Sequence, residues 1–535
     1  MQRDIEALSK QKFDLAVIGG GIQGAATARE AALRGLKVAL VEARDFASGT
    51  SSRSSKLIHG GLRYLEQLEF KLVHEARRER QLLMKLAPHL ARPQPFLLPI
   101  YENDPFSSLK VRTGLTIYDL FGNLGKKDRH RMVRRDTAIG LMPALRAEGL
   151  EAGALYHDST TDDARLTIEN VLDAANHGAV VANYAELRAL EVSADGKDEI
   201  TSGEVEDRLT GRRVEIAARF WVNAAGPWVD RVRALLPQFD GSNTVRLTKG
   251  THLIVPAVTG RLALLAAVAP GDRVFLMVPW HGHALLGTTD TDFEEDPTTV
   301  APDPADIEYL LNAANRVLRH PLTTTDVKGS WAGVRALAIE PEKPGESPSD
   351  NTREYRFHED PWANNFVSIC GGKLTTARAL GDKLVDQVAA RLGAATNGVS
   401  SRAAPLPGGH TGKFGAFVNY AAWEAVRQYD VPYEIGERIV RTYGSRWRQV
   451  LELIRTGKAL AEPLPGEPSL LAAEVDFAIR QEMAVKAEDF LYRRSGLNWA
   501  AGLTKEVQPA VEEIFARHFA SLGRGSCFPD AGGSH

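Results

Sequence analysis

A glycine-rich turn near the N-terminus constrains the fold of this chain more than any other feature. The segment from Gly19 to Gly24 reads Gly-Gly-Gly-Ile-Gln-Gly, a G-x-G-x-x-G pattern with Gly21 at its centre. An apolar run at 13–18 predicts a buried strand before the turn, and alanines at helical spacing over 22–36 predict a closely packed helix after it. The first glycine permits a tight turn, the second lets the backbone approach a pyrophosphate at the helix N-terminus, and the third lets helix and strand pack closely.

A second strand and an acidic residue complete this pattern. Residues 37–41 form another apolar run, so the segment predicts a βαβ unit with parallel strands. Glu42 follows this strand, 18 residues after Gly24, where a carboxylate suits a hydrogen bond to a ribose hydroxyl. An acid at this place argues against a cofactor with a 2′-phosphate. The segment therefore predicts a dinucleotide-binding domain and is compatible, taken alone, with either NAD or FAD.

A second glycine turn favours a flavin. Residues 366–369 predict a strand that turns at Gly371 and Gly372 into a helix from about Thr375. The N-terminus of such a helix directs backbone N–H groups and a partial positive charge at an anion. A reduced flavin carries negative charge on its pyrimidine edge, so this helix would stabilise it electrostatically.

Length and composition limit the remaining options. The 535 residues exceed what one hydrophobic core holds, so we expect two or three domains. A net charge of -3 gives no global attraction to nucleic acid, and two cysteines, Cys370 and Cys527, are too few for a disulfide framework or a zinc cluster. The polar N-terminus lacks the apolar core of a signal peptide, and no uncharged apolar run approaches the length of a membrane span. A reducing cytoplasmic setting fits best.

The rest of the chain shows alternating helical and strand patterns. A long helix is expected over 66–90. Strand signals follow in four stretches: 179–184, 187–192, 219–223 and, in short pieces, 253–287. The stretch PLPGGHTG at 405–412 predicts a linker, and nearly every segment beyond it has helical periodicity. We therefore expect a separate C-terminal helical domain.

Six strings of residues together resemble the bacterial aerobic FAD-dependent, quinone-linked glycerol-3-phosphate dehydrogenases, membrane-associated enzymes of glycerol catabolism. They are VIGGGIQGAATAREAALRGL, SSKLIHGGLRYLE, VNAAGPWVD, GTTDTDF, GVRAL and ICGGKLTTAR. The resemblance runs from about residue 13 to about residue 515, and SSKLIHGGLRYLE is its most specific part. It implies a flavoprotein that oxidises glycerol 3-phosphate to dihydroxyacetone phosphate by hydride transfer to non-covalent FAD and passes the electrons to a membrane quinone.

Four departures from the family pattern leave the flavin prediction intact and loosen the prediction of the substrate. Ala26 replaces a glycine, Glu30 replaces an aspartate, Ala377 replaces a tyrosine, and GVRAL replaces GVRPL. A relative acting on another polyol phosphate, such as erythritol phosphate, therefore stays open. So do an oxidase that passes electrons to oxygen and a non-catalytic or RNA-modifying flavoprotein, the last of which is opposed by the substrate cations named below.

The resemblance implies an α/β fold built from a discontinuous Rossmann-like FAD-binding domain, an inserted α+β substrate domain and a C-terminal all-helical domain. The expected ranges are 13–75, 151–245 and 326–400 for the FAD-binding domain, 76–150 and 246–325 for the substrate-binding or cap domain, and 405–535 for the helical domain.

The resemblance also implies which residues contact cofactor and substrate. The expected cofactor contacts are Gly19, Gly21, Gly24, Glu42, Ser54, Ser55, Lys56, His59, Gly60, Gly226, Gly371, Gly372, Leu374 and Thr375. Arginine forks and a lysine suit a phosphate ester. The expected substrate contacts are Arg63, Tyr64, Arg353 and Lys373. Arg335 in GVRAL is expected nearer the oxidised carbon, where it would stabilise a developing alkoxide or carbonyl oxygen.

A histidine is expected to remove the hydroxyl proton. His252 in LTKGTHLIVP is favoured because imidazole has a suitable pKa, and His59 is the competitor as well as a candidate for contact with the flavin. No metal is expected. DTDFEEDPTTVA begins at Asp290 like a calcium loop, but Glu295 replaces the sharp-turn glycine and Ala301 replaces the bidentate acid.

Residues 109–135 predict a surface that binds anionic lipid. Cations alternate there with apolar and aromatic residues: Lys110, Arg112, Lys126, Lys127, Arg129, Arg131, Arg134 and Arg135 with Leu115, Ile117, Tyr118, Leu120 and Phe121. Such a mixture holds proteins to membranes, although a solvated charged loop gives the same pattern. The expected location is cytoplasmic, at the inner face of the membrane. The expected partners are glycerol 3-phosphate, quinone and anionic lipid but no nucleic acid, and a homodimer is one option for the oligomeric state.

Overall fold

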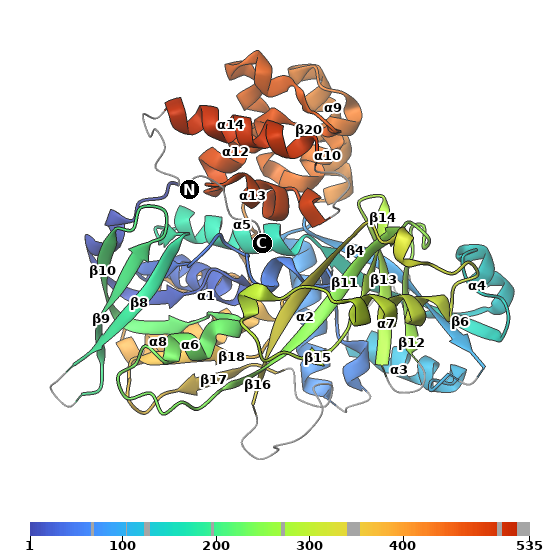
Figure 1. Ribbon diagram of the computed structural model, residues 1–535, viewed down its shortest axis with the longest axis horizontal. Coiled ribbons are helices and arrows are strands. Elements are labelled where there is room, and N and C mark those ends of the chain that lie inside the picture. Colours follow the sequence, from blue (N-terminus) through green and yellow to red (C-terminus); the bar gives the residue numbers. More distant parts are fainter. Residues whose placement is uncertain are drawn as a thin grey trace.

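Two β-sheets lie side by side beneath a helical C-terminal unit (Figure 1). The computed structural model describes residues 1–65, 69–102, 104–121, 129–193, 197–268, 273–339, 354–499 and 505–521. Over these ranges, no helix combines the length and the apolar character needed to cross a bilayer.

The first sheet contains the predicted βαβ unit. Its main strands, in spatial order, are β17 (Arg356–Glu359), β18 (Phe366–Cys370), β10 (Arg213–Asn223), β1 (Lys12–Ile18), β2 (Val38–Val41) and β7 (Val180–Ala182). Neighbours from β18 to β7 pair in parallel, and β17 pairs antiparallel at the edge. The parallel order places the carboxyl ends of β1, β2, β10 and β18 at one edge of the sheet, where an open α/β sheet binds its ligand.

Three helices cover this sheet and share its apolar core: α1 (Ile22–Leu33), α5 (Asp163–Asn176) and α8 (Ala377–Leu392). Small residues allow the close packing. A Cβ at Gly24 would lie 1.9 Å from the carbonyl oxygen of Gly19, and one at Gly381 would lie 3.0 Å from that of Ala26. The glycine pattern therefore serves the contact between helix and strand as predicted from the spacing.

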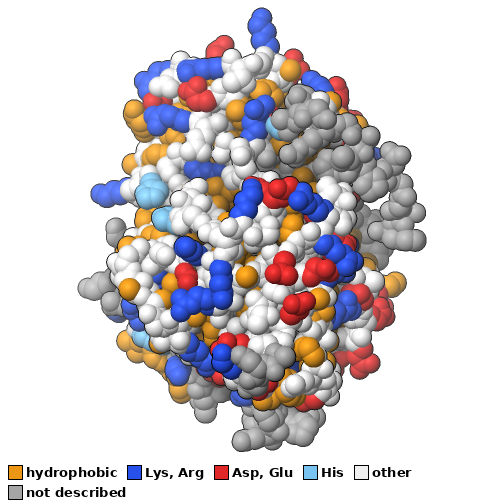
Figure 2. All heavy atoms as spheres, turned by 90° about the vertical axis from the view of Figure 1, so that its left-hand side faces the viewer, with side chains coloured by type: hydrophobic (Ala, Val, Ile, Leu, Met, Phe, Trp, Pro, Cys, Tyr) orange, Lys and Arg blue, Asp and Glu red, His pale blue; other side chains and the backbone are white. Residues whose placement is uncertain are grey.

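An antiparallel extension of this sheet lies at its outer side. Strands β8 (Ala185–Val192) and β9 (Ile200–Asp207) pair with each other, and β9 pairs with β10. On the face that includes this extension, basic side chains lie beside acidic ones (Figure 2). Arg188 lies 3.2 Å from Glu206, and Arg213 lies 2.9 Å from Glu204.

The second sheet is mostly antiparallel. Its strands are β3 (Leu57–Ile58), β4 (Ala91–Tyr101), β5 (Arg131–Arg134), β6 (Leu150–Thr161), β11 (Val245–Pro256), β12 (Ala263–Val268), β13 (Arg273–Trp280), β14 (His283–Gly287), β15 (Thr291–Asp292) and β16 (Gly329–Ala338). Helices beside it are α2 (Phe70–Leu86), α3 (Ser108–Phe121), α4 (Arg135–Leu141) and α7 (Pro304–Asn315). Strands β6 and β16 pair in this sheet although their residues fall in the ranges expected for the FAD-binding domain. Strand pairing alone does not fix where one domain ends and the next begins, so the proposed domain limits stay predictions.

In its described residues, the C-terminal unit is helical apart from one hairpin. Its elements are α9 (Phe414–Tyr429), α10 (Tyr433–Tyr443), α11 (Trp447–Leu451), β19 (Pro463–Leu464), β20 (Glu467–Leu471), α12 (Ala472–Glu482), α13 (Ala487–Asp489) and α14 (Val507–Ser521). Buried ion pairs join it to the first sheet's layer. Arg165 on α5 binds Glu482 at 2.8 Å, and Arg494 binds Asp45, which follows β2, at 3.1 Å.

Short helical turns connect these elements. They are η1 (Glu6–Ser9), η2 (Thr50–Ser52), η3 (Leu62–Leu65), η5 (Gly226–Trp228), α6 (Val229–Arg233), η6 (Pro297–Thr299), η7 (Thr324–Asp326), η8 (Gly444–Arg446), η9 (Glu452–Thr456), η10 (Lys458–Ala461), η11 (Phe490–Arg494) and η12 (Leu497–Trp499).

Candidate active site

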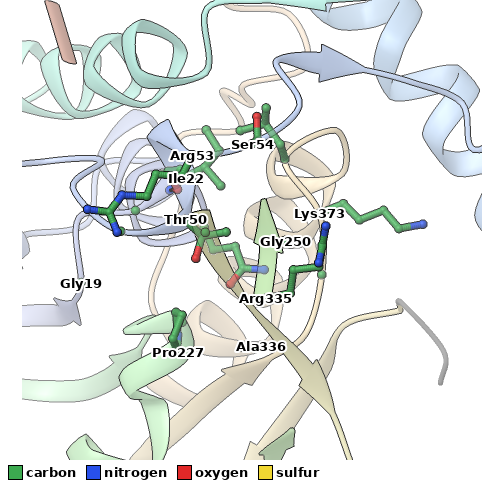
Figure 3. Close-up of a pocket in the computed structure, with 18 of the residues that line it drawn as sticks. Gly19, Ile22, Thr50, Arg53, Ser54, Pro227, Gly250, Arg335, Ala336 and Lys373 are labelled. Atoms are coloured by element: carbon green, nitrogen blue, oxygen red, sulfur yellow. Dashed lines mark hydrogen bonds between the residues drawn. The ribbon is translucent and has the colours of Figure 1, made fainter. Parts of the chain in front are cut away.

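A cavity of about 690 Å³ is lined by residues from both sheets (Figure 3). Both predicted glycine turns reach it, one after β1 and one after β18. Strands β11, β13, β14 and β16 of the second sheet supply the opposite lining. The site therefore lies at the carboxyl edge of the parallel strands, where the sequence pattern predicts a dinucleotide.

The two glycine turns are joined directly, although 348 positions separate them. The side-chain amide of Gln23 donates a hydrogen bond to the carbonyl of Gly371 at 2.6 Å. Gly19 and Gly371 have φ values of 106° and 76°, a left-handed region that favours glycine. A Cβ at Gly372 would lie 2.4 Å from the amide nitrogen of Gln23. Glycine is therefore needed where these turns approach each other.

Glu42 is fixed at the end of β2 by its own neighbourhood. Its two carboxylate oxygens accept hydrogen bonds from the backbone N–H groups of Gly20 at 2.7 Å and Arg44 at 2.9 Å. Burial raises the pKa of Glu42, and these hydrogen bonds oppose that shift. The carboxylate also lines the cavity. Glycine backbone on one side and an oriented carboxylate on the other fit the pyrophosphate and ribose of a dinucleotide.

Arg335 projects from β16 into this cavity (Figure 3). Its guanidinium donates to the hydroxyl of Thr288 at 3.0 Å and lies 3.2 Å from a carboxylate oxygen of Asp290. The Arg335 side chain is 20% exposed. Its guanidinium is therefore held by protein groups and still lines the cavity. Gly250, on the neighbouring strand β11, leaves space for the guanidinium, since a Cβ there would lie 2.2 Å from it.

His252 lies on β11 and also lines the cavity. Its Nε2 lies 2.8 Å from the hydroxyl of Ser55, and its ring stacks on Trp331 with centroids 5.5 Å apart. Burial lowers the pKa of His252 well below its usual value, and the charges of Arg335 and Lys56 lower it further. The imidazole is therefore neutral at neutral pH, as a proton acceptor must be.

Lys373 and Tyr64 meet at another part of the lining. The ammonium of Lys373 lies 3.5 Å from the centre of the Tyr64 ring, which is a cation–π contact. His59 stacks beside the same tyrosine with centroids 6.5 Å apart. The structure thus brings together a lysine, a tyrosine and a histidine that SSKLIHGGLRYLE and ICGGKLTTAR contribute from distant parts of the chain.

Most of the predicted cofactor contacts lie on the cavity lining. They are Gly19, Gly21, Glu42, Ser54, Ser55, His59, Gly226, Gly371, Gly372, Leu374 and Thr375. Gly24 is instead buried in the packing of α1 on β1. The ammonium of Lys56 is bound to Asp163 at 2.7 Å, away from the lining. The backbone N–H of Gly60 donates to the hydroxyl of Tyr118 at 2.9 Å. These three residues support the site loops in this geometry, and any direct cofactor contact from them stays a prediction.

Two predicted substrate residues cannot be placed with the others. Arg353 falls in 340–353 and lies outside the described residues. Arg63 belongs to η3, but its side chain is likewise outside the described part of the structure. Of the four expected substrate contacts, the structure therefore brings Tyr64 and Lys373 to the cavity. Among the residues it describes, no group of three histidine, cysteine or acidic side chains is arranged to hold a metal ion.

Sequence reasoning missed several residues of the lining. Gln23 lies in the variable part of the glycine pattern, and Arg53 precedes SSKLIHGG by one position. Thr288 lies in GTTDTDF, a string used only for family resemblance. Gly250 is also missed, because it matters only through the space that it leaves for the guanidinium of Arg335 on the neighbouring strand. The resemblance could have drawn attention to Arg53 and Thr288, whereas Gly250 gives no signal of its own.

Known proteins match this chain over most of its length. A family model described as FAD dependent oxidoreductase matches residues 14–387, and one described as the C-terminal domain of alpha-glycerophosphate oxidase matches residues 399–521. The aerobic glycerol-3-phosphate dehydrogenase of Staphylococcus haemolyticus is 34% identical over 95% of this chain and 91% of its own length. The enzyme of the same name from Staphylococcus aureus is 35% identical over 91% and 87%.

Solved structures show the same relationship. The glycerol-3-phosphate dehydrogenase of Bacillus halodurans, complexed with FAD, has a TM-score of 0.75 and 30% identity over 99% of this chain and 98% of its own. The L-alpha-glycerophosphate oxidase of Mycoplasma pneumoniae, with FAD bound, has a TM-score of 0.55 over 71% and 94%, and its 19% identity indicates a shared fold alone.

These matches confirm the predicted fold class, the FAD cofactor and the assignment as an enzyme. The glycine turns and the oriented Glu42 carboxylate have the chemistry that fits the pyrophosphate and the ribose of FAD. The chain therefore belongs to the FAD-dependent oxidoreductase family and, within it, to the aerobic glycerol-3-phosphate dehydrogenases.

Proposed function

We propose that this chain oxidises sn-glycerol 3-phosphate to dihydroxyacetone phosphate and passes the electrons to a membrane quinone. One observation carries the proposed oxidation: His252, Arg335, Lys373 and both glycine turns line the same cavity. A proton acceptor, an oxyanion-stabilising cation and a phosphate-binding cation are the groups that such a reaction needs. The name shared by the relatives at 34% and 35% identity supports the same substrate.

His252 is the proposed general base. Its neutral imidazole would take the proton of the secondary hydroxyl, and the hydroxyl of Ser55 at 2.8 Å holds the ring in place. His59, which also lines the cavity, is the alternative. FAD, when bound, supplies the acceptor for the hydride that leaves the carbon.

Arg335 is proposed to stabilise the oxygen that loses this proton. Its guanidinium is held by Thr288 and Asp290, so it needs little reorganisation when negative charge develops. Lys373, beside Tyr64, is proposed to bind the substrate phosphate, together with Arg63 and Arg353. Binding by these groups would exist before and during the reaction, while the contact with Arg335 would strengthen in the transition state.

The quinone assignment rests on the surface of α3. Leu109 and Leu120 on this helix are 74% and 71% exposed, and Lys110 and Arg112 are exposed on the same helix. Exposed apolar side chains beside cations favour a peripheral contact with anionic lipid, where quinone is found. The residues 122–128 of the predicted lipid-binding segment, including Lys126 and Lys127, lie outside the described residues. Peripheral membrane association and a homodimer both stay proposals.

A steady-state assay of the purified holoenzyme with an artificial electron acceptor tests the function. The substrates to compare are glycerol 3-phosphate, erythritol 4-phosphate and glycerol. The proposal expects glycerol 3-phosphate to give the highest kcat/KM and glycerol to give almost none. A higher kcat/KM for erythritol 4-phosphate would change the substrate, and stoichiometric peroxide formation under air would replace quinone by oxygen.

A further inference from the structure

Several cations on the cavity lining have no role in the proposed reaction, and Arg53 is one of them. Arg53 follows the turn η2 directly, and its side chain lines the cavity. In Figure 3 this side chain extends toward the side of the view where Gly19 and Ile22 lie, whereas Lys373 lies on the other side. Arg53 is therefore not placed with the proposed phosphate-binding lysine.

Arg53 differs from most other arginines of the lining because no described carboxylate lies close to its guanidinium. Four of them lie 3.0–3.5 Å from a carboxylate oxygen: Arg188, Arg208, Arg231 and Arg335. Among the residues that the structure describes, Arg53 has no carboxylate within 4.0 Å, and its Nε is buried without a hydrogen-bond partner. A buried cation without a counter-charge is unfavourable, so an anion from outside the protein is expected to complete this site.

The neighbourhood of Arg53 is itself positive. Burial lowers the pKa of Arg53 to about 10, and the charges of Arg44 and Arg493 contribute to this shift. Trp499 of the C-terminal unit lies under the guanidinium, with 5.9 Å between the guanidinium carbon and the ring centre. Arg44 also lines the cavity, but it lies over Trp228 at 4.8 Å and beside Glu42, whose charge balances part of its own.

The backbone before Arg53 is tied to the start of α1. The hydroxyl of Ser51 accepts a hydrogen bond from the N–H of Ile22 at 2.9 Å. Arg53 therefore follows, by two residues, a side chain that touches the helix N-terminus at which a dinucleotide places its pyrophosphate. A diphosphate would supply the negative charge that no described carboxylate within 4.0 Å gives to Arg53, and a guanidinium can form bidentate hydrogen bonds with phosphate oxygens.

We propose that Arg53 binds the diphosphate of FAD and forms, with the N-terminus of α1, a two-sided clamp on that group. Trp499 packs against the guanidinium and orients it toward the cavity. In this arrangement the two phosphate-bearing molecules of the reaction bind to different cations: the cofactor to Arg53 and the substrate to Lys373.

Dilution of the holoenzyme tests this assignment. The dissociation constant for FAD is measured from the fluorescence of released flavin for the parent, Arg53→Met, Arg53→Lys and Arg213→Met. Arg213 pairs with Glu204 away from the cavity, so this control removes a positive charge without touching the site. A lost charge-assisted hydrogen bond predicts a roughly 10- to 100-fold weaker affinity for Arg53→Met. Arg53→Lys should recover part of this loss, and Arg213→Met should resemble the parent.

Competition against FAD identifies the group that Arg53 contacts. ADP and adenosine are added to the diluted holoenzyme, and the loss caused by Arg53→Met should appear for ADP but not for adenosine. Equal losses for both competitors, or an FAD affinity within about twofold of the parent, would overturn the proposal. An increase of KM for glycerol 3-phosphate in FAD-saturated enzyme, without a change in FAD affinity, would also overturn it. If Arg53→Met does not fold, the same measurements on Arg53→Gln test whether Arg53 binds the diphosphate.

Discussion

Gly250 on β11 leaves the space that the guanidinium of Arg335 on β16 occupies. A Cβ at Gly250 would lie 2.2 Å from this guanidinium, while the strands themselves pair through Gly250 and Gly333. The guanidinium is the end of a flexible side chain, so Gly250→Ala should displace it and leave the sheet intact. We expect kcat to fall about 10- to 100-fold, because small displacements of a positioned group cost about this much. Stopped-flow or steady-state turnover measures the effect.

Gly140 provides the matched control for that substitution. A Cβ there meets nothing within 4 Å among the described residues, and its backbone is helical. Gly140→Ala should therefore keep the parent kcat and the parent FAD content. A Gly250→Ala enzyme with unchanged kcat would show that Arg335 does not act at the reacting oxygen.

Lys373→Met should separate binding from turnover. Its ammonium is proposed to bind the phosphate in the ground state and in the transition state alike, so KM for glycerol 3-phosphate should rise roughly 10- to 100-fold. The value of kcat should change by less than about threefold. Lys383→Met, on an exposed side chain paired with Glu75, is the control. A large loss of kcat at unchanged KM would move Lys373 from phosphate binding to the chemical step.

The dependence of kcat/KM on pH tests His252 as the base. Burial, Arg335 and Lys56 lower the pKa of His252, so the imidazole stays unprotonated below the ordinary histidine value of about 6.5. Activity should therefore persist from neutral pH down through about 6.5 and fall only when the pH drops through the lowered pKa. An acid limb centred near the ordinary value would contradict this assignment.

Replacement of the base gives a second readout of the same claim. His252→Gln should lower kcat by about 10²- to 10⁴-fold, the usual contribution of general base catalysis. His320→Gln, on an exposed histidine, should have no effect. If His59→Gln gave the large loss and His252→Gln did not, the two histidines would exchange roles.

How much the sequence predicts depends on whether a residue acts within its own segment. The strand, turn, helix and second strand of the N-terminal unit lie within three residues of the expected limits, because apolar periodicity and glycine spacing are local signals. Strand β4 is not among the expected elements, and its Pro93, Pro95 and Pro99 are unfavourable for a strand by local propensity. It nevertheless pairs with β6 along its length, so long-range pairing outweighs local propensity here.

In the site, too, residues in local motifs are predictable from the sequence, and residues that depend on distant neighbours are not. The string SSKLIHGGLRYLE and both glycine turns identify residues that the structure brings to one cavity. The space at Gly250 depends on a neighbour from another strand. The surroundings of Arg53, which include no carboxylate among the described residues, depend on neighbours from distant segments such as Trp499 of the C-terminal unit. Neither property belongs to a single segment, so no local pattern could predict it.

Exposed leucines on α3 should contribute to membrane binding. Leu109 and Leu120 are 74% and 71% exposed, and their burial in lipid would be favourable. The double replacement by glutamine should weaken binding to vesicles with anionic lipid about tenfold and leave activity with a water-soluble acceptor unchanged. Val399→Gln, at another exposed apolar side chain, is the control. Unchanged co-sedimentation of the double variant would place the lipid contact elsewhere.

Anaerobic reduction of the bound flavin tests the central claim most directly. The holoenzyme is mixed with glycerol 3-phosphate without any electron acceptor, and the loss of the oxidised flavin absorbance is followed in time. We expect complete bleaching at a rate that saturates with glycerol 3-phosphate, together with one dihydroxyacetone phosphate per flavin. Glycerol at the same concentration should cause almost no bleaching. A flavin that stays oxidised with glycerol 3-phosphate, or that glycerol bleaches equally fast, would contradict it.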